Sequence, residues 1–163
     1  MTTDVFSPEK RSAVMRRVKG RDTAPEMTVR RLLWRLGARY RLHRADLPGR
    51  PDIVLASRRL AIFVHGCFWH GHDCARGARV PKANRDYWLA KVGRNRTRDA
   101  AARGELERRG WRVVTVWECE LKDAAGLEAR LRSCLAAPFP LGESQNPRPA
   151  QRGEGRVRGL SAQ

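Results

Sequence analysis

Residues 50–74, RPDIVLASRRLAIFVHGCFWHGHDC, decide the fold and carry three of the four His and two of the four Cys of this chain. Residues 52–56 and 60–65 are two mostly apolar runs joined by a short polar segment. Runs of this length predict β-strands, and apolar residues on both faces predict strands at the centre of a sheet. We therefore expect a hairpin whose second strand leads into a segment rich in His, Cys and aromatic residues.

A helix and an edge strand precede this hairpin. Thr23 and Glu26 have the spacing of a capping box, apolar residues follow at helical intervals, and Gly37 stands at the expected end of the helix. Tyr40 and Leu42 alternate with arginines at 39, 41 and 44, which favours an edge strand with a basic outer face. Glu26 either only caps the helix or also takes part in a site, and the sequence leaves both open.

The segments after residue 74 complete an α/β pattern. Residues 86–109 predict a long helix closed by Gly110, residues 111–119 a strand, and residues 127–135 a last helix. The inward stripe of the long helix is Val92, Asn95, Asp99, Ala102 and Leu106. A carboxylate on such a stripe needs a partner, unless the helix is rotated and the carboxylate is solvated. The element order predicts an α/β fold with a central mixed sheet flanked by helices.

The two ends of the chain differ from this central domain at residues 21–137. Residues 1–20 form a basic segment with few apolar side chains, Met15 and Val18 among them, and we expect an arm that orders on a partner. From residue 138 onward the chain is rich in Pro, Gly, Arg and Ser without periodicity, which predicts a disordered tail.

The chain is strongly basic. Its 163 residues carry a formal net charge of +17, the isoelectric point is near 11.4, and 29 of the 34 Lys and Arg residues are Arg. Such a charge attracts polyanions, and Arg makes the two-pronged contacts that suit phosphate and guanine. A GC-rich genome would also raise the share of Arg, but it does not account for the net charge. Nucleic acid is therefore the leading partner, ahead of an acidic membrane surface.

The sequence has no signal peptide and no apolar run approaching about 18 residues, so we expect a soluble, intracellular protein. In that compartment four Cys indicate metal ligands or reduced thiols before disulfides. Cys67, His72 and Cys74 are three zinc-type ligands within eight residues. Cys119 is one candidate for the fourth ligand of a structural site. Cys134 is the other, although its place on an amphipathic helix favours a buried thiol.

Asp52 and two further histidines suggest catalytic chemistry beside that zinc site. Asp52 follows Pro51 at the margin of the sheet, where a carboxylate can bind Mg²⁺. If His72 binds zinc, His65 and His70 stay free, and a neutral imidazole near a metal-bound phosphate can take a proton from water. Asp52 can also be an ordinary turn residue, and each histidine an additional zinc ligand or a structural hydrogen-bond partner.

Adjacent aromatic residues on this loop favour contact with DNA bases. Phe68 and Trp69 stand between potential zinc ligands, and Trp88 follows near the start of the long helix. Bulky aromatics on a pinned loop of a basic protein suit insertion between base pairs. The alternative is that the aromatics pack over the zinc.

Four segments resemble the bacterial very short patch repair endonucleases: Arg21-Asp22-Thr23, residues 47–52 (LPGRPD), residues 65–74 (HGCFWHGHDC) and residues 116–119 (VWEC). The resemblance covers roughly residues 15–121, and the GCFWHxHxC segment is highly specific. It implies a restriction-endonuclease-like core. It also implies Mg²⁺-dependent nicking of duplex DNA on the 5′ side of the thymine in T:G mismatches, which arise when 5-methylcytosine deaminates.

The resemblance also implies roles for single residues. Asp52 would bind the catalytic Mg²⁺ together with the backbone carbonyl of Val64, and His70 would activate the attacking water. His65 and Asp99 would hold metal-bound waters.

The remaining roles concern the edge of the site, zinc and DNA. Glu26 would lie at the edge of the site. The zinc ligands would be Cys67, His72, Cys74 and Cys119. The residues that wedge beside the mismatch would be Phe68, Trp69 and Trp88 from the major groove, with Met15 opposite.

The chain departs from the family in small ways, and two rival functions stay open. Val64 stands where the family often has Thr, and the acid-x-Lys pattern of restriction enzymes is absent. The rivals are a zinc-stabilised DNA-binding module without catalysis and a nuclease of the same fold with different duplex specificity. We expect a monomer of the bacterial cytoplasm, associated with the nucleoid and not with membranes, and leave open a partner from the general mismatch-repair machinery.

Overall fold

The computed structural model describes residues 20–82 and 84–137. The elements in chain order are α2 (Ala24–Arg35), β1 (Arg41–Leu42), β2 (Ile53–Leu55), η1 (Ala56–Arg58), β3 (Leu60–His65), α3 (Arg85–Arg108), β4 (Arg112–Trp117), η2 (Glu118–Lys122) and α4 (Ala124–Ala136). The predicted order of helices and strands is confirmed. The expected basic arm, apart from Gly20, and the expected tail lie outside the described residues, and so does Met15.

The four strands form one mixed sheet in the order β1-β2-β3-β4. β2 and β3 are the predicted antiparallel hairpin, with Ile53 opposite Ile62, and β1 pairs antiparallel with the outer side of β2. β3 and β4 run parallel, with His65 opposite Trp117. A parallel pair needs a crossover connection, and α3 supplies it.

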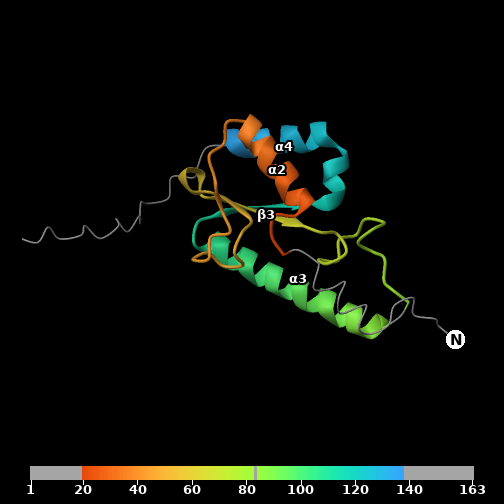
Figure 1. Ribbon diagram of the computed structural model, residues 1–163. Coiled ribbons are helices and arrows are strands. Elements are labelled where there is room, and N and C mark those ends of the chain that lie inside the picture. Colours follow the sequence, from red (N-terminus) through yellow and green to blue (C-terminus); the bar gives the residue numbers. More distant parts are fainter. Residues whose placement is uncertain (1–19, 83, 138–163) are drawn as a thin grey trace, which may run out of the picture.

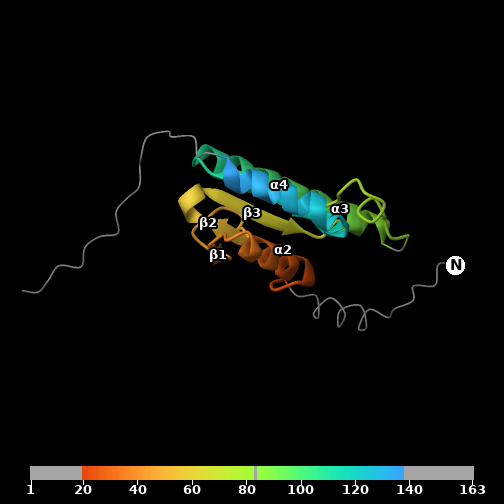
Figure 2. The ribbon, with the colours of Figure 1, turned by 90° about the horizontal axis from the view of Figure 1, so that it is seen from above.

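The helices cover both faces of the sheet (Figure 1). α3 crosses one face, and α2 and α4 lie together on the other, as the view from above also shows (Figure 2). Because side chains alternate along a strand, Leu60 and Ile62 of β3 enter the α2–α4 core, while Phe63 and His65 face α3. This alternation places His65, the last residue of β3, on the face that α3 covers.

The start of α2 follows the predicted capping chemistry with one difference. The Thr23 hydroxyl accepts a hydrogen bond from the Glu26 backbone N–H at 3.4 Å and donates to the Glu26 carboxylate at 3.1 Å. The same carboxylate accepts the backbone N–H of Asp22, whereas a capping box would return that bond to Thr23. At the other end Gly37 adopts a positive φ of 72°, the conformation that commonly follows a helix.

Two element boundaries differ from the prediction by two or more residues, each for a local reason, and others shift by one residue. β4 ends at Trp117, because the Glu120 carboxylate accepts the Trp117 backbone N–H at 2.6 Å and the chain turns into η2. Cys119 is therefore not on the strand face where the alternation placed it. α4 begins three residues early, because Asp123 caps it by accepting the Gly126 N–H at 2.9 Å. Among the described residues, no helix is long and apolar enough to cross a membrane.

Candidate active site and metal centre

Four cysteine and histidine side chains from two distant segments meet at the end of the β3–β4 pair. The ligand atoms of Cys67, His72, Cys74 and Cys119 all lie within 4.8 Å of one another. Cys119 Sγ is 3.5 Å from His72 Nδ1. Sulfur and nitrogen ligands on one tetrahedral zinc would lie about 3.6 Å apart, given typical Zn–S and Zn–N bond lengths. The donor set and its spacing therefore fit a zinc ion.

This grouping contains the four expected zinc ligands and leaves out the two alternatives, Cys134 and His70. Cys134, the competing fourth ligand, packs against the α2–α4 core and belongs to no such cluster among the described residues. His70 stands apart from the thiols and contacts Asp99. Cys119 joins the cluster because the turn into η2 carries it beyond the sheet.

The acid–base properties of the thiols also suit a cation. Burial raises the pKa of Cys67 to about 12, so the thiol keeps its proton when no positive charge is near. The hydrogen bond with His72 and the backbone N–H of Gly77 lower the pKa of Cys74 to about 6. A divalent cation would allow both to bind as thiolates, which is the form that coordinates zinc.

The loop that carries these ligands is fixed against α3. Asn95 of the helix donates a hydrogen bond to the backbone carbonyl of Trp69 at 2.8 Å. Gly71 has a φ of 62°, and a Cβ at this position would lie 2.6 Å from Val92 of α3. The inward orientation predicted for Asn95 is therefore confirmed, and it holds the backbone that presents His70.

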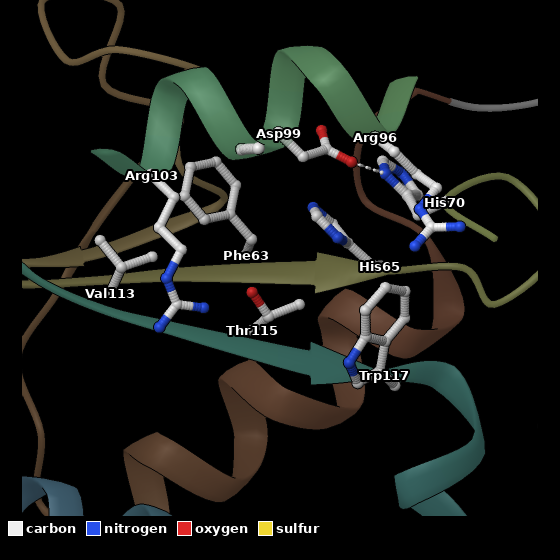
Figure 3. A pocket seen from close by; sticks show the side chains of 10 residues that line it. Phe63, His65, His70, Arg96, Asp99, Arg103, Val113, Thr115 and Trp117 are labelled. Atoms are coloured by element: carbon white, nitrogen blue, oxygen red, sulfur yellow. Dashed lines mark hydrogen bonds and ion pairs between the residues drawn. The ribbon is translucent and has the colours of Figure 1, made fainter. Parts of the chain in front are cut away.

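A second cluster, formed by His65, His70 and Asp99, lies between α3 and the sheet (Figure 3). His70 Nδ1 lies 2.5 Å from Asp99 Oδ2, and the His65 and His70 rings stack at 3.7 Å. The inward orientation of Asp99 is confirmed. Because the carboxylate accepts the Nδ1 proton of His70, Nε2 of this ring is the nitrogen left for a reacting group.

Burial and interactions with His70 determine the charge states of His65 and Asp99. Burial lowers the pKa of His65 to about 4, with a further contribution from the neighbouring His70, so His65 is neutral near pH 7. Burial raises the pKa of Asp99, but the hydrogen bond and the charge of His70 outweigh it and the net shift is downward. Asp99 is thus an anion that supports His70, and His65 is an uncharged polar ring beside it.

Asp52 lies directly before β2, at the position predicted for it. Its Oδ2 accepts the backbone N–H of Val64 at 2.7 Å, across the hairpin. Burial raises the pKa of Asp52, while the Val64 hydrogen bond lowers it, and the net shift is upward. A partly buried carboxylate of this kind binds a cation readily, because the cation offsets the cost of burial.

Asp52, the predicted metal-binding carboxylate, and His70, the predicted base, border the same cavity. One cavity of about 700 Å³ has these polar lining residues among others: Glu26, Asp52, His65, His70, Asp99 and Glu118. Asp52 is nevertheless not part of any three-residue cluster close enough to hold an ion by itself within the described segments. An ion bound by Asp52 would need further ligands such as backbone carbonyls, water or phosphate, which is usual for Mg²⁺.

A smaller cavity of about 190 Å³ borders the same histidines (Figure 3). His65, His70 and Asp99 line it together with Arg96 and Arg103, two cations from the same face of α3. The histidine pair therefore borders two cavities.

Phe68, Trp69 and Trp88 pack on one another at ring distances of 5.2 to 5.9 Å and are half-buried. Lys91 Nζ lies 5.5 Å from the Trp69 ring centroid. The ring that packs on the thiol cluster is a different one, because Trp117 stacks on His72 at 4.3 Å. The three aromatics thus form one group beside the large cavity, whose lining includes Trp69 and Lys91.

Glu26 belongs to a buried network whose other members the sequence did not reveal as site residues. Arg30 Nη2 lies 2.9 Å from Glu26 Oε2 and 3.0 Å from His43 Nε2, and His43 Nδ1 lies 3.9 Å from Asp52 Oδ1. One signal was available, because Arg30 follows Glu26 by four residues and so lies on the same face of α2.

A basic α/β domain that gathers carboxylates and imidazoles beside a thiol cluster is typical of a nuclease. The sequence model of one family, described as DNA mismatch endonuclease Vsr, matches residues 3–76. The chain belongs to the DNA mismatch endonuclease Vsr family and is a DNA endonuclease, a hydrolase.

Three relatives illustrate this membership. The Type II nicking enzyme V.XorIIP of Xanthomonas oryzae pv. oryzae is 55% identical over 133 residues, which is 82% of this chain and 97% of that protein. The Type II nicking enzyme V.NmeAIP of Neisseria meningitidis is 46% identical, over 79% and 91% of the two chains. The DNA mismatch endonuclease Vsr of Escherichia coli is 44% identical, over 73% and 76%.

Among solved structures, the catalytic domain of homing endonuclease I-Bth0305I superposes with a TM-score of 0.47 and 22% identity. The superposition covers 69% of this chain and 94% of that one.

Proposed function

We propose that this endonuclease nicks duplex DNA on the 5′ side of the thymine in T:G mismatches left by deamination of 5-methylcytosine. The observation that carries the proposal is the cavity that Asp52, His70 and Asp99 share, next to the thiol cluster of Cys67, His72, Cys74 and Cys119. The names of the relatives agree with it, because one is a mismatch endonuclease and others are nicking enzymes.

The cavity residues would divide the reaction among them. Asp52 and the carbonyl of Val64 would hold Mg²⁺, which when bound stabilises the negative charge that develops on the phosphate and the leaving oxygen. His70 would take a proton from the attacking water at Nε2, while Asp99 holds the Nδ1 proton and balances the charge that the ring gains. His65, uncharged near pH 7, would hold a water in place.

Glu26 would act at the edge of the site by holding Arg30, because both of its carboxylate oxygens are already hydrogen-bonded. Zinc would be structural, bound by the Cys67, His72, Cys74 and Cys119 side chains. The core would be of the restriction-endonuclease-like type, which the order helix, three strands, helix, strand supports.

Selectivity would come from the aromatic group. Phe68, Trp69 and Trp88 would insert beside the mismatch from the major groove, with Met15 of the N-terminal segment opposite. Insertion unstacks base pairs, and a T:G wobble pair is cheaper to distort than a Watson–Crick pair. We also propose that the enzyme works as a monomer on the bacterial nucleoid in the cytoplasm, and that a general mismatch-repair protein is a candidate partner.

Strand-labelled duplexes test the proposed reaction. We expect a nick in the thymine strand of a T:G duplex, on the 5′ side of that thymine, with Mg²⁺ and none with EDTA. Equal cleavage of all mismatched duplexes in a panel would reject T:G selectivity and favour a nuclease with other specificity. Binding without any Mg²⁺-dependent nick would reject catalysis at this cavity.

Replacing Trp69 by Ala tests the wedge. Base–aromatic stacking is worth about 1–3 kcal/mol per base, so we expect mismatch binding to weaken by roughly 5- to 150-fold, with less loss on a matched duplex. Trp34→Ala is the matched control, because Trp34 is an exposed tryptophan on α2 away from the cavity. An equal loss on both duplexes would show that Trp69 serves general binding only.

Replacing Cys119 by Ser tests the zinc site. The variant should lose bound zinc, measured by elemental analysis, and should unfold at a clearly lower temperature, because structural zinc contributes several kcal/mol to folding. Cys134→Ser is the matched control, since Cys134 is a thiol outside the cluster. A Cys119 variant with full zinc content and unchanged unfolding would remove Cys119 from the ligand set.

A further inference from the structure

Arg30 is a buried cation that joins α2 to the strand segment leading into the site. Its side chain is 7% exposed, and its two terminal nitrogens contact Asp22 Oδ1 at 2.5 Å, Glu26 Oε2 at 2.9 Å and His43 Nε2 at 3.0 Å. The ligand atoms of Asp22, Glu26 and His43 lie close enough together to hold a metal ion. The guanidinium already contacts all three, so it provides the positive charge there.

The contact with Arg30 fixes the proton position on His43. A guanidinium has only donors, so the nitrogen that faces it must accept, and His43 Nε2 carries no proton. In the neutral ring the proton is then on Nδ1. The arginine thus selects one tautomer of the imidazole.

His43 in this tautomer carries its proton on Nδ1, the ring nitrogen that lies near the carboxylate of Asp52. Nδ1 lies 3.9 Å from Asp52 Oδ1, too long for a direct hydrogen bond, but close enough for the positive end of the N–H dipole to act on that oxygen. The backbones are joined as well, because the His43 N–H donates to the Asp52 carbonyl at 3.2 Å. His43 adopts a φ of 46°, a conformation uncommon for a residue other than Gly.

The two carboxylate oxygens of Asp52 therefore have different neighbours. Oδ2 accepts the Val64 N–H at 2.7 Å, and Oδ1 faces His43. Asp52 therefore contacts Val64 of β3 through its side chain, and it contacts His43, which follows β1, through both its backbone and its side chain. Such supporting contacts orient carboxylates that bind metals.

We propose that Arg30 and His43 form a positioning pair for Asp52, in which Arg30 sets the His43 tautomer and His43 orients the carboxylate. This inference rests on the proposed role of Asp52 in binding Mg²⁺. Neither side chain contacts the reacting atoms, so both act through Asp52.

The tautomer can be measured directly. In the magnesium-free enzyme labelled with ¹⁵N-histidine, a long-range ¹H–¹⁵N spectrum near pH 8, where imidazoles are neutral, should show His43 protonated at Nδ1. His43→Gln identifies the signal among the four histidines. Arg30→Met should shift His43 toward the Nε2-protonated form, while Arg31→Met, an exposed neighbour on α2, should not.

A His43 ring protonated at Nε2 in the unaltered enzyme would overturn the proposal. So would an imidazolium that donates to Glu26 Oε2, which lies 3.7 Å from Nε2.

Kinetics with two His43 variants measures the consequence. Gln can accept from Arg30 with its carbonyl and donate toward Asp52 with its amide, whereas Leu fills the space without either contact. We expect His43→Leu to lower Mg²⁺ affinity or single-turnover nicking roughly 10- to 100-fold, and His43→Gln to restore most of it. Thermal unfolding of both variants checks that they fold.

Equal behaviour of the Gln and Leu variants would overturn the positioning role. The proposed function fails separately: an unchanged nicking rate in an Asp52→Asn enzyme would remove Asp52 from the reaction, whatever tautomer His43 adopts.

Discussion

An Asp52→Asn enzyme should bind a T:G duplex and nick it about 10²–10³-fold more slowly than the unaltered enzyme. The expected size is that of losing one preorganised charge contact to a transition state. Asn keeps the shape of the side chain and can still accept the Val64 N–H, but it lacks the charge that we propose holds Mg²⁺. Single-turnover nicking and duplex binding, measured on the same preparation, separate catalysis from affinity.

The stability of this variant has a predictable sign. Burial raises the pKa of Asp52 on folding, so above the folded pKa the ionised carboxylate destabilises the folded protein. Without Mg²⁺, Asp52→Asn should therefore unfold at an equal or higher temperature near pH 7. Asp46→Asn is the matched control, because Asp46 is an exposed carboxylate paired with Arg44 in the segment before β2. An unchanged nicking rate in the Asp52→Asn enzyme would exclude Asp52 from the mechanism.

A His70→Ala enzyme should lose roughly 10²–10⁴-fold in nicking rate, the range that a positioned general base contributes. The loss should fall on the single-turnover rate at saturating DNA, because His70 lines the cavity and its ring stacks on His65. Added imidazole should restore part of the rate by occupying the space of the missing ring. Asp99→Asn should give a smaller loss, since it leaves the base and removes only its partner.

Two results would contradict this assignment. A His70→Ala enzyme with an unchanged rate would show that another group activates water. A weaker duplex affinity with an unchanged rate would show that His70 serves binding.

The two candidate centres are structurally joined through Trp117. Its ring stacks on His72 of the thiol cluster at 4.3 Å and meets His65 edge-on at 5.3 Å. His70 lies in the same loop as Cys67 and His72, and Asn95 of α3 donates a hydrogen bond to this loop at the Trp69 carbonyl. Movement of the thiol cluster would therefore displace His70 as well. Loss of the proposed structural zinc is therefore expected to reduce nicking as well.

The sequence alone determined the element types, their order and most members of the candidate site. The hairpin at β2 and β3 is predicted by apolar runs, and α3 by a stripe with a period of three to four residues, because both signals are local. Cys67, His72 and Cys74 are close in the chain and so had to be close in space. Asp99 was placed inward because a helix of known phase fixes which residues share a face.

Only the tertiary structure brought the expected Cys119 into one cluster with Cys67, His72 and Cys74, and only it revealed that His43 lies beside Asp52 and contacts Arg30. Cys119 reaches the cluster through a turn after Trp117 that a hydrogen bond from the backbone to Glu120 creates, and strand alternation does not predict this turn. The contact of Arg30 with His43 depends on how α2 packs beside the end of β1. Such packing arises from contacts between residues far apart in the chain, and no local pattern carries that information.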